Sequence, residues 1–250
     1  MAPLPATVAR LLNPGAKKSG LVINGRPVAV TLRRNSRAKR IIVRLSKNGE
    51  GIVITVPPGA SDKKAIEFAA SQAAWIEQQL ARQPLVRHIE DGAVIMFRGV
   101  EHVICHSNER RTPVWTGTSD ERPVIFVSGQ KAHLPRRLGD WLKRQARSDL
   151  SAAATDYAQK MGVKVRRLSI RDTSSRWGSC SAQGALSFSW RLVLAPPEVL
   201  DYVAAHEVAH LIEMNHSERF WQLVETHCPH AGRAKSWLRR NGSNLHAIGI

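Results

Sequence analysis

Four residues with metal-binding or catalytic side chains lie close together in the stretch YVAAHEVAHLIEMNHSERFW: His206, Glu207, His210 and His216. Histidines four residues apart project from one face of a helix, about one turn apart, so both imidazoles can bind the same tetrahedral ion. Glu207 is rotated about 100° around the helix axis from His206. This position suits a carboxylate that activates water instead of binding the metal. The H-E-x-x-H spacing therefore predicts a zinc site with Glu207 as its general base.

The third ligand is predicted to be His216, with Glu225 as the alternative. His216 follows His210 by six residues, which is the spacing of the longer H-E-x-x-H-x-x-G-x-x-H signature. Glu213 stands where that signature has glycine, so we expect Asn215, which tolerates positive φ, to turn the chain. Glu225 on the following helical run would instead give a ligand set of two histidines and one glutamate.

Other residues of this region are expected to be structural. His227 and His230 have no ligand spacing and are expected at the surface near the site. Phe220, Trp221 and Trp237 are expected to be core residues between the last helices, because large aromatic side chains bury much apolar area.

The elements that must position these residues are predicted to be β-rich at the front and helical at the back. Runs of β-branched residues broken by Asn-Gly and other glycine turns predict consecutive hairpins over residues 21–34, 40–58 and 93–106. Helical spacing of apolar residues predicts one amphipathic helix over 61–82, capped by Ser61, and a long helix that ends at Gly162. After Pro196-Pro197 the chain is predicted to be helical almost to its end, while the polar segment 173–184 is predicted to be a loop between two strands.

Length and composition indicate an ordinary globular chain. Its 250 residues can bury a sizeable core without disulfides, and its three cysteines lack Cys-x-x-Cys spacing, which fits a reducing cytoplasm. The N-terminus lacks the features of a secretory signal, and no apolar run approaches the roughly 18 to 20 residues of a membrane span. The predicted location is therefore cytoplasmic.

The formal net charge of +17 is large, and no acidic residue precedes Glu50. Such a field attracts polyanions. This charge fits a solvated basic surface, and it also fits contact with nucleic acid, nucleotides or acidic lipid. The stretch RRNSRAKR does not favour nucleic acid over the other interpretations, because it holds no aromatic residue that could stack on a base.

Two blocks of the sequence resemble the YgjP-like metallopeptidase domain family, which is related to the SprT-like and WLM zincins. These blocks are the segment RWGSCS from Arg176 and the H-E-x-x-H run, which AKSWLRRNG follows. The resemblance is strongest over residues 171–242 and implies that His206, His210 and His216 are zinc ligands and Glu207 the catalytic base. It also implies that the segment from Arg176 forms a loop and edge strand along the cleft.

In that segment Arg176 suits an anionic or carbonyl group of a substrate, and Trp177 is a second candidate for substrate binding. Trp177 equally suits a core position between sheet and helix, and Cys180 suits a small buried apolar position.

The expected fold class is α+β: a β-rich N-terminal lobe followed by a compact helical, zincin-like lobe with a short sheet. The expected division is a flexible basic tail over residues 1–20, the β-rich lobe with its amphipathic helix over 21–132, and the hydrolase lobe over 133–250.

The predicted function is that of a zinc-dependent metallopeptidase acting on peptides or proteins. One alternative is a metal-dependent nucleoside triphosphate pyrophosphatase, suggested by the basic surplus and Arg176. Another is a nucleic-acid-associated protein that the basic front half targets. Three histidine donors favour zinc over the Mg²⁺ or Mn²⁺ usual in phosphate chemistry.

Overall fold

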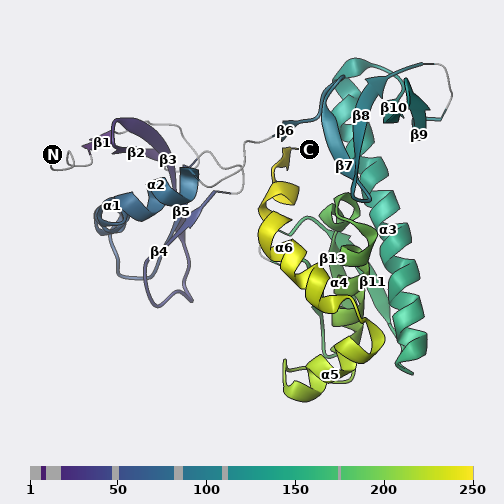
Figure 1. Cartoon of the computed structure of the whole chain (residues 1–250). Helices are drawn as coiled ribbons and strands as arrows, with labels where there is room; N and C mark the ends of the chain where they lie inside the picture. Colours follow the sequence, from purple (N-terminus) through teal and green to yellow (C-terminus); the bar gives the residue numbers. More distant parts are fainter. Residues whose placement is uncertain are drawn as a thin grey trace. The chain divides into compact units, whose positions relative to one another are not determined.

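The computed structural model describes residues 7–9, 18–46, 51–81, 87–108, 112–173 and 176–249. The chain forms two compact units, residues 1–86 and 87–250 (Figure 1). Each unit has its own cluster of buried apolar side chains, and each cluster draws its residues from one unit alone. The fold class is α+β, as predicted.

The first unit is a mixed β-sheet with helices α1 (Asp62–Ser71) and α2 (Ala73–Ala81) packed on one face. The strands are β1 (Thr7–Ala9), β2 (Lys18–Ile23), β3 (Arg26–Arg34), β4 (Ile42–Leu45) and β5 (Gly51–Val56), in the order β1-β2-β3-β5-β4. The hairpin predicted over 21–34 is confirmed, with Asn24 and Gly25 at positive φ in its turn. Strands β3 and β5 pair in parallel, which the predicted hairpins did not include.

The prediction of one continuous helix over 61–82 was wrong, because the helix is interrupted at Gln72. Ser61 caps α1 as predicted, since its hydroxyl accepts a hydrogen bond from the Lys64 N–H at 3.1 Å. At the other end the Ser71 hydroxyl donates to the Phe68 carbonyl at 2.7 Å, and Gln72 adopts φ −98° and ψ 16°. A hydroxyl bonded to a carbonyl one turn back competes with the helical backbone pattern.

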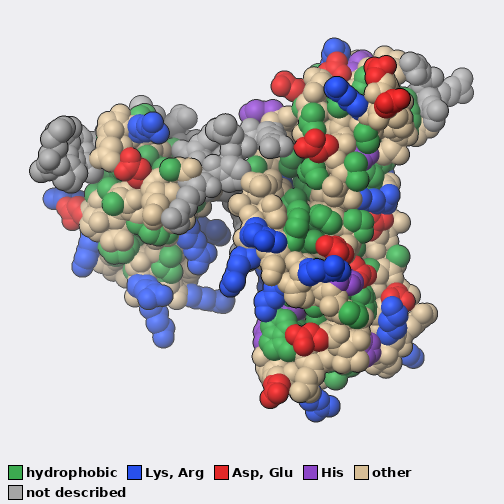
Figure 2. Space-filling view, viewed as in Figure 1, with side chains coloured by type: hydrophobic (Ala, Val, Ile, Leu, Met, Phe, Trp, Pro, Cys, Tyr) green, Lys and Arg blue, Asp and Glu red, His purple; other side chains and the backbone are tan. Residues whose placement is uncertain are grey.

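The basic excess is concentrated in the first unit. Its sequence holds fourteen Lys and Arg against four Asp and Glu, and Figure 2 shows basic side chains protruding from it. Arg34 forms an ion pair with Asp62 at 2.5 Å. Contact with nucleic acid through this unit stays a prediction.

The second unit holds the sequence blocks that carry the predicted chemistry (Figure 1). Its helices are α3 (Leu134–Lys160), α4 (Pro197–Ala209), α5 (Glu218–His227) and α6 (Ala231–His246), with 3-10 turns η1 (Lys131–His133) and η2 (Trp190–Leu194). Strands β7 (Val94–Phe97), β8 (Val100–His106), β10 (Arg122–Val127) and β9 (Val114–Ser119) form one sheet in that order. Strands β11 (Arg167–Arg171), β13 (Ala185–Ser189) and β12 (Gly178–Cys180) form another, and β6 (Arg87–His88) pairs with β14 (Ile248–Gly249).

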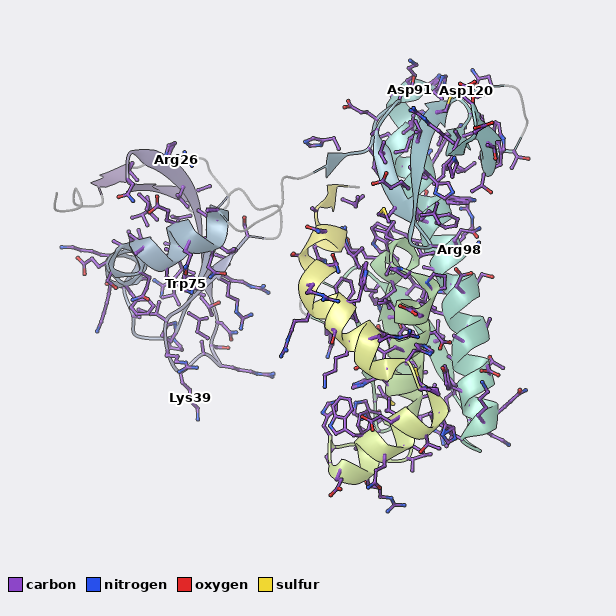
Figure 3. All side chains as sticks on the ribbon, viewed as in Figure 1. Arg26, Lys39, Trp75, Asp91, Arg98 and Asp120 are labelled. Atoms are coloured by element: carbon purple, nitrogen blue, oxygen red, sulfur yellow. The ribbon has the colours of Figure 1, made fainter. Side chains whose placement is uncertain are left out.

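The observed division at residue 86 differs from the boundary expected at residue 132, because strands β7 to β10 pack with the helical part. The tight turn between β7 and β8 reaches η2, where the Arg98 N–H donates to the Val193 carbonyl at 2.8 Å. The Arg98 side chain, labelled in Figure 3, forms two hydrogen bonds with Asp149 of α3, at 2.9 and 2.7 Å. Alternating apolar residues predict strands but do not identify the core against which they pack.

The expected tail, residues 1–20, lies mostly outside the described residues. Where the chain is described there, it forms β1 and the start of β2. Among the described residues, no helix is both long and apolar enough to cross a lipid bilayer.

Candidate metal centre

Helix α4 carries the first two predicted ligands and the predicted base at its C-terminal end. Pro197 stands in its first turn, where a missing N–H costs no helical hydrogen bond. The helix contacts α3, α5, α6 and β12, and most of its residues are buried. Glu207 is therefore only 6% exposed, and His210, which caps the helix, is 8% exposed.

The structure brings His206, His210 and His216 together. One ring nitrogen of each lies within 4.8 Å of the other two, and the Nε2 atoms of His206 and His216 are 3.1 Å apart. At that distance the two nitrogens cannot both be protonated, because the protons would point at each other. At least one of them therefore presents a lone pair. Three imidazoles that converge in this way can fill three positions of a tetrahedral ion and leave the fourth open.

Hydrogen bonding at the outer ring nitrogens differs between the ligand candidates. The Nδ1 atom of His210 lies 3.0 Å from the Glu213 carbonyl, to which it can donate, which leaves Nε2 with its lone pair for a metal. The Nδ1 atom of His206 is buried and has no hydrogen-bond partner among the described residues. The orientation of the His206 ring therefore depends on its packing.

The chain reverses between α4 and α5 without the left-handed residue that we expected. Asn215 does not have positive φ; its side-chain oxygen instead accepts a hydrogen bond from the Ser217 N–H at 2.9 Å. Such an Asx turn reverses the chain with ordinary backbone angles. Ser217 then caps α5 by accepting from the Phe220 N–H at 3.3 Å, which sets His216 against the end of α4.

The Phe220 ring packs against all three imidazoles. Phe220 is fully buried, stacks on His210 at a centroid distance of 4.5 Å, and meets His206 and His216 at 4.9 Å each. Its core position was predicted. The apolar ring keeps water from this side of the histidines and fixes their orientations. Trp221 and Trp237 are partly buried against the same core.

Burial favours the neutral form of His206 and His210. Burial, together with the neighbouring His210 and His216, lowers the pKa of His206 to about 3, and burial is the largest of these causes. Burial also lowers the pKa of His210, although the hydrogen bond to the Glu213 carbonyl opposes this shift. Neutral imidazoles present the lone pairs that a metal ion requires.

The carboxyl group of Glu207 lies beside the histidines in an apolar environment. Burial raises its pKa to about 7, and the charge of Arg176 opposes this shift. The backbone of β12 passes so close that a Cβ added at Gly178 would lie 2.5 Å from the Glu207 Cγ. Glycine at this position therefore leaves the space that the carboxylate occupies.

A pocket of about 320 Å³ opens over Glu207 and His206. It is lined by Arg176, Trp177, Gly178, Tyr202, Val203, His206, Glu207, Lys235 and Leu238. Lys235 was not identified from the sequence. It lies on α6, exposed, with its Nζ 4.0 Å from the centre of the Trp221 ring. The helical run AKSWLRRNG in which it lies was recognised only as part of the family pattern.

The polar segment 173–184 was predicted as a loop from its residues, and it contains both substrate-binding candidates and the short edge strand β12 that the family resemblance implied. Arg176 is exposed at the pocket. Trp177 is half-buried, stacks on His246 at 4.6 Å and abuts Gly242 of α6, so it packs as well as lining the pocket. Burial raises the pKa of Cys180 to about 11, which leaves this thiol unreactive at neutral pH.

Comparison with known proteins agrees with the sequence pattern. A family model described as YgjP-like, metallopeptidase domain matches residues 39–241. The chain belongs to the YgjP-like metallopeptidase domain family. No curated protein matches the sequence.

A solved structure that matches this YgjP-like domain is the crystal structure of the metallopeptidase zymogen of Pyrococcus abyssi abylysin, at 23% identity. The match covers 40% of this chain and 99% of that one, with a TM-score of 0.34. A TM-score of this size does not establish a common fold. The family match makes the chain a metallopeptidase in general terms.

Glu225, the alternative third ligand, and His230, expected at the surface, both lie apart from the three histidines of this YgjP-like domain. Glu225 is exposed on α5 and is not part of the histidine group. His230, expected at the surface, is half-buried, and its Nε2 lies 3.0 Å from an Asp201 carboxylate oxygen. Spacing alone did not reveal this contact, because the two residues lie on different helices.

Proposed function

We propose that the chain is a zinc-dependent metallopeptidase in which His206, His210 and His216 hold the ion and Glu207 is the general base. The observation that supports this most directly is the convergence of three imidazoles at the end of α4, with the buried carboxyl group of Glu207 beside His206 on the wall of one pocket. Nitrogen donors suit zinc, whereas Ca²⁺ and Mg²⁺ prefer oxygen. When bound, zinc supplies Lewis acidity toward a carbonyl group and makes water more acidic.

Glu207 has the properties that a proton carrier needs. It lies one residue from a ligand candidate, it faces the pocket, and a pKa of about 7 allows it to accept and release a proton near neutral pH. We assign it two steps: it takes a proton from the attacking water and then gives that proton to the departing amine. Gly178 keeps the room in which the carboxyl group makes both contacts.

Strand β12 offers a surface for a peptide backbone. The Ser189 N–H donates to the Trp177 carbonyl, and the Ser181 N–H donates to the Ala185 carbonyl, so residues 177, 179 and 181 direct their backbone groups toward β13. The backbone groups of Gly178 and Cys180 then point away from the sheet, at its free edge. An extended peptide paired there would pass beside Glu207, and main-chain hydrogen bonds would hold it without regard to sequence.

Two cations at the pocket suit an anionic or carbonyl group of the substrate. Arg176 enters from the chain before β12 and Lys235 from α6. We assign Arg176 to substrate binding because its guanidinium can form paired hydrogen bonds with a carboxylate. Trp177 shapes the same wall of the pocket.

The test is hydrolysis by purified protein, measured with a peptide library and a panel of nucleoside triphosphates side by side. We expect peptide cleavage that a chelator abolishes and added zinc restores, with about one zinc per chain needed for this activity. Hydrolysis of nucleotides alone would replace the peptidase proposal with the phosphoanhydride alternative. Peptide cleavage that survives complete metal removal would exclude the metal mechanism.

A further inference from the structure

A second group of metal-binding side chains lies outside the site described above: Asp201, Cys228 and His230, here called the Asp–Cys–His cluster. Asp201 belongs to α4, Cys228 follows the last turn of α5, and His230 precedes the first turn of α6. Their ligand atoms all lie within 4.8 Å of one another. Cys228 is fully buried, so its sulfur can reach only its immediate neighbours.

The Nε2 atom of His230 faces two groups at once. It lies 3.0 Å from Asp201 Oδ2 and 3.3 Å from Cys228 Sγ. A proton on this nitrogen can be donated to the carboxylate, but the nitrogen then has no lone pair for the thiol S–H. Without that proton the nitrogen accepts from the thiol but opposes the carboxylate, lone pair against lone pair. An ion between the three atoms would receive a lone pair from each.

The spacing of the cluster resembles that of the three histidines. The Nε2 atoms of His206 and His216 are 3.1 Å apart, and in the cluster the contacts of the His230 nitrogen are 3.0 and 3.3 Å. Ligands at about 2.0 to 2.3 Å from a tetrahedral zinc ion are roughly 3.3 to 3.7 Å apart. Small outward movements of the side chains would therefore admit an ion.

We propose that the Asp–Cys–His cluster is a second, structural zinc site. A thiolate, an imidazole and a carboxylate are donors that zinc accepts together, whereas Ca²⁺ and Mg²⁺ do not take sulfur. The charges balance, because a thiolate and a carboxylate offset one divalent ion; the thiol proton is released to solvent on binding. Asp201 also lines a pocket of about 590 Å³, so solvent adjoins the cluster on the side of this carboxylate.

The site would tie α4, which carries His206, to the segment between the last two helices. The Tyr157 hydroxyl of α3 donates to Asp201 Oδ2 at 2.5 Å. Asp201 precedes His206 by five residues, which is about 7.5 Å along the helix axis and roughly 140° around it. The two ions would not form a two-metal catalytic centre, whose ions lie about 3.5 to 4 Å apart. The second ion would therefore stabilise the folded state and would take no part in catalysis.

Cobalt substitution of the full chain separates this site from the histidine site, because only the Asp–Cys–His cluster contains a thiolate. Protein loaded with Co²⁺ should show a thiolate-to-cobalt charge-transfer band in the near ultraviolet and should bind about two ions per chain. Cys228→Ser should lose the band and about one ion. Cys105→Ser, in β8, is the matched control and should keep both.

His230→Ala is the second variant, because His230 is partly exposed and its truncation disturbs packing less than a change at Cys228. We expect this variant to lose one ion and the charge-transfer band and to keep the circular dichroism of the wild type. Its melting temperature should be lower than that of the wild type only when metal is present. His206→Ala should lose the other ion and keep the band, so failure of the catalytic site is distinguishable. One ion per chain with no charge-transfer band in the wild-type protein would show that the cluster is a hydrogen-bonded network only.

Discussion

At the scale of single residues, burial determines the chemistry available to the site. Glu207 and His206 lie next to each other in the sequence, yet burial moves their pKa values in opposite directions. An apolar environment disfavours the charged form of each, which is the anion of one and the cation of the other. The result at neutral pH is a neutral imidazole beside a carboxyl group that can exchange its proton.

This burial has a cost that can be measured in metal-free protein. The carboxyl group of Glu207 ionises at about 7 in the folded state, and its usual pKa is 4.5. Between these pH values the folded state binds more protons than the unfolded chain, so stability falls as pH rises. Above pH 7 the loss is complete, at about 3 kcal/mol.

Glu207→Gln removes the ionisation, so the metal-free variant should gain about 2 to 3 kcal/mol over the wild type near pH 8 and almost nothing near pH 4. Urea unfolding of both chelated proteins across this range provides the comparison. An equal difference in stability between variant and wild type near pH 4 and near pH 8 would mean that the effect comes from packing and not from ionisation.

The third ligand can be tested with a matched pair of variants. Removal of a ligand should weaken zinc binding by more than the roughly 10- to 100-fold that loss of an outer hydrogen-bond partner costs. We expect this loss in His216→Ala, whereas Glu225→Gln should bind zinc like the wild type because Glu225 is exposed and outside the histidine group. Competitive titration with a chelating dye measures both affinities. The reverse pattern would assign the third position to Glu225.

The histidines and Glu207 could be predicted because they belong to one helix and the turn after it, where spacing in sequence translates into spacing in space. Lys235 and Gly178 could not be predicted in this way. They reach the pocket from α6 and β12, and only the packed structure shows that these elements meet α4. The Asp–Cys–His cluster was missed for the same reason.

At the scale of elements, the contact between β12 and α4 sets the space around Glu207, the proposed base. The long helix ending before Gly162 and the helical run after Pro197 were predictable from apolar spacing and helix-ending residues. A strand of three residues such as β12 is too short to give an alternating pattern, so the residues alone predicted a loop there and only the family resemblance implied an edge strand. The break at Gln72 was missed because apolar spacing continues across it.

Gly178→Ala tests the contact between β12 and the base. The added Cβ would overlap the Glu207 side chain, so the carboxyl group must move by a fraction of an ångström or more. We expect a roughly 10- to 100-fold loss of turnover, as small misplacements of catalytic groups cause, with zinc content unchanged. Gly232→Ala on α6 is the control, since a Cβ there meets no atom within 4 Å. Equal turnover in both variants would show that the Glu207 position does not depend on β12.

At the scale of the whole molecule, the two cores are separate. Buried residues of the second unit begin at Ile89, and those of the first unit end at Ile76. The first unit carries much of the positive charge, and the second carries all the residues assigned to metal binding and catalysis. The sequence indicated the charge asymmetry but placed the boundary too late, because strands of both units have the same alternating pattern.

A fragment of residues 87–250 should therefore fold by itself and bind zinc. The expected result is a cooperative thermal transition and a metal content equal to that of the full chain. Calorimetry and elemental analysis of the fragment provide the measurement, with the full chain as reference. An unfolded fragment would show that the first unit contributes to the stability of the second.

The central claim is that Glu207 acts as the base while three histidines hold zinc. Zinc content and peptide turnover, measured together on Glu207→Gln and the wild type, test it most directly. Glutamine keeps the shape and hydrogen bonds of the side chain but cannot take a proton, so we predict full zinc occupancy and a loss of turnover of roughly 100-fold or more. Wild-type turnover in the zinc-loaded variant would contradict the assignment.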